Sequence, residues 1–142
     1  MKTEATKRDI LLVALEAAPL DRLRLMKTAF LVWHLGGRPK TGPFDFEPYL
    51  YGPCAFDLYT TLNQLAAEGL VVRTPYPEPR WAPYHLTAAG RRQAAAASYG
   101  LGDRMAGRIM KIAGWAEKQS FRSLLDYVYK EAPDFAIRSV VR

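Results

Sequence analysis

Apolar residues recur at helical spacing in two segments near the start of the chain. The first covers residues 7–18 and is closed by Pro19. The second covers residues 22–35, with Asp21 as a suitable N-cap and Gly36 directly after the last apolar position. Apolar side chains fall every three or four residues along this second segment: Leu23, Met26, Phe30 and Trp33. The pattern predicts two helices, the second lying at the centre of the fold.

An extended segment and a third helix follow. Residues 44–53 carry aromatic and aliphatic side chains in extended alternation, and Pro48 restricts the segment to an edge position or to a non-paired stretch. We expect a turn at Gly52-Pro53. A helix is predicted over residues 55–68, ended by Gly69, because three leucines share one face: Leu58, Leu62 and Leu65.

Beyond residue 69 the apolar period changes from 3.6 toward 2. Residues 70–74 and 81–87 predict two strands of a β-hairpin, joined by an extended tip that three prolines stiffen. Thr87 and Ser120 are suitable N-caps for two later helices, with a further helix from residue 103 between them. The tail, residues 134–142, alternates weakly and predicts a short strand or an arm.

This order of elements indicates a mainly α protein with a small β-hairpin, in the α+β class. The first five elements are those of a winged helix-turn-helix, followed here by C-terminal helices. We assign residues 1–98 to a winged-helix core. Residues 99–142 form a helical extension that packs on the core or forms a dimer seam, within a single domain overall.

The composition offers little support for catalysis. The single cysteine, Cys54, cannot form an internal disulfide, and His34 and His85 lack the spacing of a zinc site. Cys54 has no base beside it in the sequence, so we interpret it as a small buried residue. The sequence predicts a cytoplasmic, non-enzymatic protein with no catalytic residue, metal or cofactor and no membrane segment.

The positive charge is concentrated in the second half of the chain. Residues 1–70 contain eight basic and eight acidic residues, whereas residues 71–142 contain twelve basic and six acidic ones, which accounts for the net charge of +6. Clustered positive charge attracts phosphates and gains free energy from released counterions. The asymmetry therefore favours a polyanionic partner such as duplex DNA.

Three groups of residues are candidates for contacting DNA. The outward face of helix 55–68 offers Thr60, Asn63 and Gln64, although Asp57 and Glu68 on the same helix repel phosphates. The tip of the hairpin is flanked by Arg73 and Arg80. The helix from residue 103 carries a basic stripe, interleaved with Trp115, that spans about 80° of its circumference: Arg104, Arg108, Lys111 and Lys118. The alternative for helix 55–68 is a protein-binding face, and the alternative for the hairpin arginines and for the stripe is a solvated surface.

Two stretches resemble known families. LNQLAAEGLVVR followed by YHLTAAGRR resembles the third helix, wing and following cap of winged-helix regulators of the PadR and MarR kinds. RLRLMKTAFLVWHL with FDFEPYLYGPCAFDLYTTLNQLAAEGLV is similar to the Panacea-type domain, with Met26 and Cys54 as departures. The matching positions are Leu25, Lys27, Phe30, Phe46, Tyr51, Gly52, Pro53 and Tyr59. The second resemblance implies a winged-helix-like domain that binds a toxin in antitoxin proteins and serves as an adaptor or regulator in relatives.

Two functions follow as hypotheses. The first is a homodimeric winged-helix regulator that binds duplex DNA through helix 55–68, the wing at 73–81 and the basic stripe. The alternative is a protein-binding module of the antitoxin or adaptor kind, with an aromatic docking surface around the YGP sequence. That surface would comprise Tyr49, Tyr51, Phe56 and Tyr59, which have the composition of an interface hot spot or of a packed aromatic core.

Overall fold

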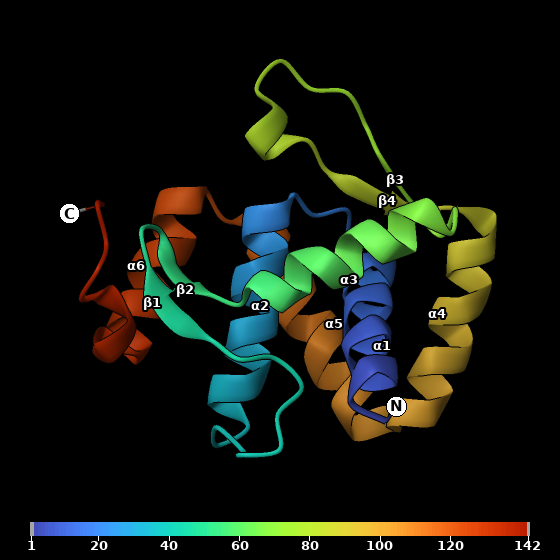
Figure 1. Ribbon diagram of the computed structural model, residues 1–142, viewed down its shortest axis with the longest axis horizontal. Coiled ribbons are helices and arrows are strands. Elements are labelled where there is room, and N and C mark those ends of the chain that lie inside the picture. Colours follow the sequence, from blue (N-terminus) through green and yellow to red (C-terminus); the bar gives the residue numbers. More distant parts are fainter. Residues whose placement is uncertain (1, 142) are drawn as a thin grey trace.

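The computed structural model describes the backbone of residues 2–141 and the side chains of residues 6–141. Within these residues the chain is mainly helical, with two small antiparallel sheets of two strands each (Figure 1). The helices are α1 Lys2–Ala17, α2 Arg22–Leu35, α3 Phe56–Ala67, α4 Ala88–Leu101, α5 Asp103–Lys118 and α6 Phe121–Glu131. The strands are β1 Glu47–Tyr49, β2 Gly52–Cys54, β3 Val71–Arg73 and β4 Tyr84–Leu86. The predicted order of elements is confirmed.

The first two helices form the centre of the molecule. Helix α1 begins at Lys2, five residues earlier than the apolar pattern predicted, because its first turns carry polar residues that leave no periodic signal. The carboxylate of Asp21 caps α2 as predicted, accepting hydrogen bonds from the backbone N–H groups of Leu23 and Arg24 at 3.0 Å each. Every residue of α2 from Leu25 to Val32 is buried, which confirms its central position.

The extended segment forms a hairpin of its own. Strands β1 and β2 pair antiparallel with Pro48 opposite Pro53, so the turn lies at Leu50 and Tyr51. The turn predicted at Gly52-Pro53 is therefore wrong. Gly52 has a φ of +89° and faces α6, where a Cβ would lie 3.1 Å from side-chain atoms of Leu125 and Tyr129. The glycine at position 52 is therefore needed for this close packing.

The second hairpin is the predicted one. Its strands β3 and β4 pair antiparallel, with Val71 opposite Leu86 and Arg73 opposite Tyr84. Its long tip includes the 3-10 turn η1, Pro79–Trp81, and projects from the body of the molecule (Figure 1). Leu20, between α1 and α2, adds a bridge to β4. Its N–H donates to the carbonyl of Tyr84 at 3.3 Å, and the N–H of Tyr84 donates back at 2.8 Å.

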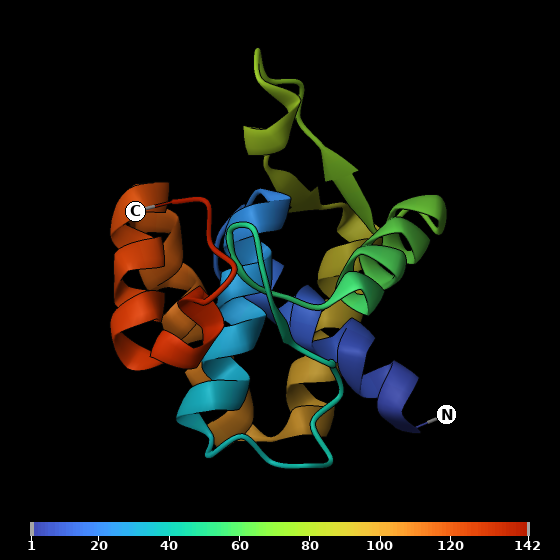
Figure 2. The ribbon, with the colours of Figure 1, turned by 60° about the vertical axis from the view of Figure 1, so that its left-hand side comes forward.

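The C-terminal helices pack on this core. Helix α4 continues through residue 98, where the core was predicted to end, because its small residues favour helix up to Gly102. Helix α5 packs against α1 and α2, and α6 packs against α2 (Figure 2). Four residues of the apolar face of α5 are buried against the rest of the chain: Ala106, Ile109, Ala113 and Ala116.

The tail forms neither a strand nor a free arm within the described residues. Pro133 starts a second 3-10 turn, η2 Pro133–Ala136, since proline cannot continue α6 with a backbone N–H. The chain then returns to the first hairpin, where the N–H of Val140 donates to the carbonyl of Leu50 at 2.9 Å. The prediction of a short strand is wrong, because this single hydrogen bond is not continued as a ladder.

Candidate functional site

Helix α3 presents a polar face to solvent next to the wing. The three candidates on this face are all exposed, within little more than one turn of each other: Thr60, Asn63 and Gln64. The leucines on the opposite face are buried in the core, as the spacing predicted. The packing of α3 therefore fixes which side chains a partner can reach.

The acidic residues at the two ends of α3, Asp57 in its first turn and Glu68 at its C-cap, are paired with basic residues of α1. The Nζ of Lys7 lies 3.0 Å from a carboxylate oxygen of Asp57. The guanidinium of Arg8 donates to both carboxylate oxygens of Glu68, at 2.7 and 2.8 Å. These hydrogen bonds hold the pKa of Glu68 below its usual range and raise the pKa of Arg8. The repulsion of phosphates expected from the two acids is thus offset by two neighbouring cations.

The two wing arginines occupy different environments. Arg73 ends β3, is exposed, and its guanidinium lies 5.9 Å from the ring centre of Tyr84 across the hairpin. Arg80 lies in η1 and is half-buried, with its guanidinium 5.9 Å from the ring of Tyr51 and 5.6 Å from that of Trp81. The proline-rich tip folds η1 back toward the body, so Arg80 belongs to the wall of a cavity and not to the outer face of the wing.

The basic stripe lies on α5, on the other side of α1 and α2 from α3 (Figures 1 and 2). Three of its residues are exposed, Arg104, Lys111 and Lys118, and Arg108 is half-buried. None of these four side chains has an ion-pair partner within the part of the chain that the structure describes. Because α1 and α2 lie between them, the stripe and the polar face of α3 are separate surfaces.

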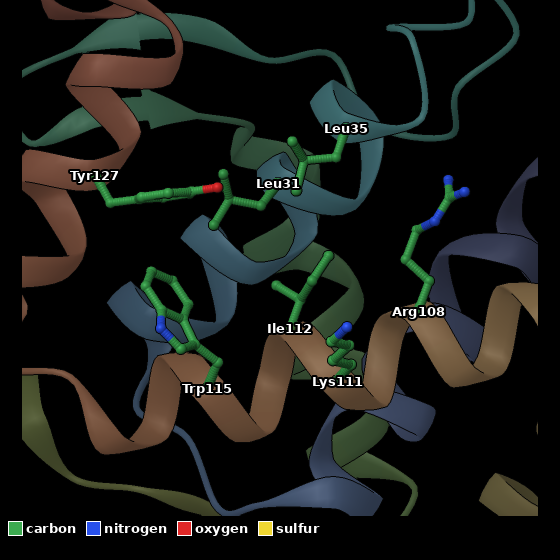
Figure 3. A pocket seen from close by; sticks show the side chains of 7 residues that line it. All are labelled: Leu31, Leu35, Arg108, Lys111, Ile112, Trp115 and Tyr127. Carbon is green, nitrogen blue, oxygen red and sulfur yellow. The ribbon is translucent and has the colours of Figure 1, made fainter.

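Arg108 and Lys111 border an apolar groove of about 400 Å³ between α2, α5 and α6 (Figure 3). Leu31 and Leu35 of α2 and Ile112 of α5 form much of its lining. Trp115, expected as an aromatic on the stripe, packs edge-on against Tyr127 of α6 with 4.9 Å between ring centres. Trp115 therefore helps to hold α6 in place.

The four aromatic candidates around the YGP sequence come together at one cavity of about 300 Å³. Tyr49 and Phe56 meet edge to face at 5.2 Å and are 38% and 51% exposed. Tyr51 and Tyr59 line the same cavity and are half-buried. Four elements contribute to the walls: α2, the β1–β2 hairpin, the first turn of α3 and η1 of the wing. The outward direction predicted for Phe56 agrees with its exposure.

Lys27 also lines this cavity, although no binding role was predicted for it from the sequence. Its side chain is 2% exposed, and its Nζ donates to the carbonyl oxygen of Pro53 at 3.1 Å. Burial lowers the pKa of Lys27 from its ordinary 10.5 to about 8. A signal was present: Lys27 lies four residues after Leu23 and three before Phe30, on the buried face of the most apolar helix.

Two further side chains of the cavity are kept neutral by their surroundings. Cys54 is buried, as interpreted from the sequence, and burial raises the pKa of its thiol. Burial likewise raises the pKa of Tyr59 to about 12. A neutral phenol donates a hydrogen bond, so Tyr59 offers a donor at physiological pH. The Cys54 thiol and the Tyr59 phenol therefore add no negative charge beside Lys27, and the nearby carboxylate is that of Asp21.

Other kinds of site find little support in residues 2–141. No group of three or more histidine, cysteine or acidic side chains among residues 6–141 is placed to hold a metal ion. His34 stacks on Phe30 with 5.6 Å between ring centres and accepts a hydrogen bond from Arg38 at 3.0 Å, which is a packing role. None of the helices in this range has the length and apolarity needed to cross a membrane.

The comparisons with known proteins leave the chain without a family assignment. No protein-family model matches it, and no curated protein or solved structure is significantly similar to it.

Proposed function

We propose that this protein is a winged-helix DNA-binding protein that contacts duplex DNA through the polar face of α3 and the β3–β4 wing. The arrangement of elements supports the proposal. Two helices, a third helix and the β3–β4 hairpin occur in winged-helix order, with the β1–β2 hairpin inserted between the second and third helices, and Leu20, between α1 and α2, adds a bridge to β4. Its proposed role is binding, without catalysis.

The observation that carries the proposal is the exposed polar face of α3 beside the wing, with its acidic residues already paired. Asn63 and Gln64 can each form two hydrogen bonds with an adenine in the major groove, and Thr60 can reach a phosphate or a thymine methyl group. Arg73 is exposed at the base of the wing and suits a phosphate contact. The Lys7 and Arg8 pairs remove the repulsion that Asp57 and Glu68 would exert.

The proposed surface is narrower than the one inferred from the sequence. It omits the α5 stripe of Arg104, Arg108, Lys111 and Lys118, because α1 and α2 separate that stripe from α3. It also omits Arg80, which faces the Tyr51 cavity. A homodimer, which we retain as a proposal, would place two α3 helices in successive major grooves and read a two-fold symmetric site.

The experiment is a salt titration of binding to a fluorescent random duplex. Asn63→Ala/Gln64→Ala and Arg73→Ala are compared with Arg104→Ala, which removes the same charge as Arg73→Ala from the α5 side. We expect affinity to fall steeply with salt, and the slope of log affinity against log salt to decrease by about one in Arg73→Ala but not in Arg104→Ala. Absence of binding at low salt contradicts the proposal.

Protein binding through the aromatic segment is a second candidate. The exposure of Tyr49 and Phe56, packed against each other at the mouth of the cavity, favours it because aromatic anchors of this kind are typical of interface hot spots. The test is isolation of a stable heteromeric complex with the wild-type chain, repeated with Phe56→Ala. Loss of the partner in the variant supports this role, and a homogeneous sample of the chain alone argues against it.

A further inference from the structure

The cavity at the YGP sequence has an uneven distribution of charge. Three cationic residues line it, and among the described residues of its lining none is acidic: the cations are Arg22, Lys27 and Arg80. The carboxylate of Asp21 is nearby but caps α2 and pairs with Arg24 at 2.6 Å. Glu78 approaches the Arg80 Nε only to 4.0 Å, and both side chains are at least 40% exposed. The lining of the cavity therefore carries an excess of positive charge, and Glu47 and Asp57 lie outside it, close enough to act on Cys54.

Lys27 gives this charge a buried component. An ammonium group has three N–H donors, and the carbonyl of Pro53 is the one acceptor it has among the described residues. Burying an incompletely hydrogen-bonded cation is unfavourable, and such groups concentrate at functional sites. The Lys27 ammonium, on a side chain that is 2% exposed, thus has two N–H donors left for a ligand.

The remaining walls suit a flat ring. Tyr49 and Phe56 stand at the mouth, and Tyr51 lies below the Arg80 guanidinium. The hydroxyl of Tyr59 has no hydrogen-bond partner within residues 6–141, so it can donate to an anion. A volume of about 300 Å³ is at the lower end of the range for small-molecule sites and accommodates one ring with one charged substituent.

We propose that this cavity binds a small aromatic anion, whose charged group contacts Lys27, Arg22 and Arg80 and whose ring lies among the tyrosines and Phe56. Guanidinium groups recognise both carboxylates and phosphates, so the shared chemistry is a planar ring bearing either oxyanion. The proposal concerns the cavity alone and does not depend on DNA binding.

A ligand at this position would contact both α3 and the wing, the two elements that carry the proposed DNA-contacting surface. Phe56 and Tyr59 belong to α3, whereas Arg80 belongs to the wing, so a molecule that contacts all three changes the free energy of their relative placement. This consequence, unlike the binding itself, rests on the proposed function.

The test is calorimetric titration of the full chain with benzoate, phenyl phosphate and the neutral benzyl alcohol. The variants are Lys27→Met, which keeps an apolar side chain of similar length in the core, and Arg80→Ala, which alters a half-buried residue at the rim. Arg92→Ala is the matched control, because Arg92 is exposed on α4, on the far side of the molecule from the β1–β2 hairpin (Figure 1).

We expect saturable binding of at least one anion and none of benzyl alcohol. Affinity should fall about tenfold or more in Lys27→Met and in Arg80→Ala, as for loss of a charge-assisted hydrogen bond, and remain unchanged in Arg92→Ala. A preference between benzoate and phenyl phosphate identifies the charged group. No binding of either anion up to millimolar concentration overturns the proposal, as does binding that Arg80→Ala and Lys27→Met leave intact. DNA binding that persists in either case leaves the proposed function standing.

Discussion

The Nζ of Lys27 donates a hydrogen bond of 3.1 Å to the carbonyl oxygen of Pro53, and so joins the centre of α2 to the β1–β2 hairpin. The bond lies under the cavity proposed to bind an anion, and its donor is almost completely buried. It fixes where the YGP sequence lies relative to the central helix. The contribution of Lys27 to the free energy of unfolding can be measured without any ligand.

Stability should rise with pH through the titration of Lys27. The pKa of Lys27 is about 10.5 in the unfolded chain and about 8 in the folded protein. Between these two pH values the unfolded state therefore binds more protons than the folded state. The free energy of unfolding of the wild type should therefore increase relative to Lys27→Met by up to about 3 kcal/mol between pH 7 and pH 10.5. Denaturant unfolding of both proteins across this range measures the difference. Parallel pH profiles contradict it.

Gly90 should tolerate no side chain. A Cβ at this position would lie 2.0 Å from the carbonyl oxygen of Leu70, which is backbone and cannot move aside. We expect Gly90→Ala to lower the free energy of unfolding by about 2 to 3 kcal/mol. Gly107→Ala in α5 is the control, with nothing within 4 Å of its Cβ, and should stabilise by about 0.5 to 1 kcal/mol. Thermal unfolding of the two variants should shift in opposite directions.

Thr87 connects the end of α3 to the start of α4. Its Oγ1 accepts from the N–H of Gly90 at 3.0 Å and donates to the carbonyl of Gly69 at 2.7 Å. Thr87→Ala should cost about 1 to 2 kcal/mol of stability, and Thr87→Ser, which retains the hydroxyl, should cost less. Equal losses in the two variants, measured by denaturant unfolding, would show that the hydroxyl contributes nothing.

Releasing Arg8 should strengthen DNA binding. Glu68 accepts two hydrogen bonds from Arg8 at the exposed end of α3, so Glu68→Gln removes a negative charge and leaves a cation beside the proposed surface. We expect tighter binding to a random duplex and a salt slope steeper by about one. Glu117→Gln, which makes the same charge change at an exposed position of α5, should leave the slope unchanged. The same steepening in both variants would indicate nonspecific attraction to net charge.

Local signals in the sequence predicted much of the fold. Asp21, Thr87 and Ser120 cap the helices that they were expected to cap, and the leucines of α3 lie in the core. The errors fell where tertiary contacts decide the structure. Gly52-Pro53 has the composition of a turn but lies in a strand, because Leu125 and Tyr129 pack where a side chain would be. Those contacts lie more than seventy positions away in sequence, so no local pattern reports them.

The candidate site was predicted only in part for a similar reason. The aromatic segment and the polar face of α3 could be read from spacing, because each lies on a single element. That Arg80 faces Tyr51, and that Arg8 neutralises Glu68, depends on how distant elements pack. The position of Lys27 on an apolar helix face could be recognised in the sequence. Its role as a cavity residue could not, because the cavity forms only when the β1–β2 hairpin packs beside α2.

The most direct test of the proposed function is amide hydrogen exchange of the protein alone and saturated with a short random duplex at low salt. Binding through α3 and the wing predicts slower exchange in residues 56–86, which include the wing tip, and unchanged exchange along α5. Protection confined to α5, or no protection anywhere in a sample that binds no duplex, would contradict the account and direct attention to the aromatic surface at Tyr49 and Phe56.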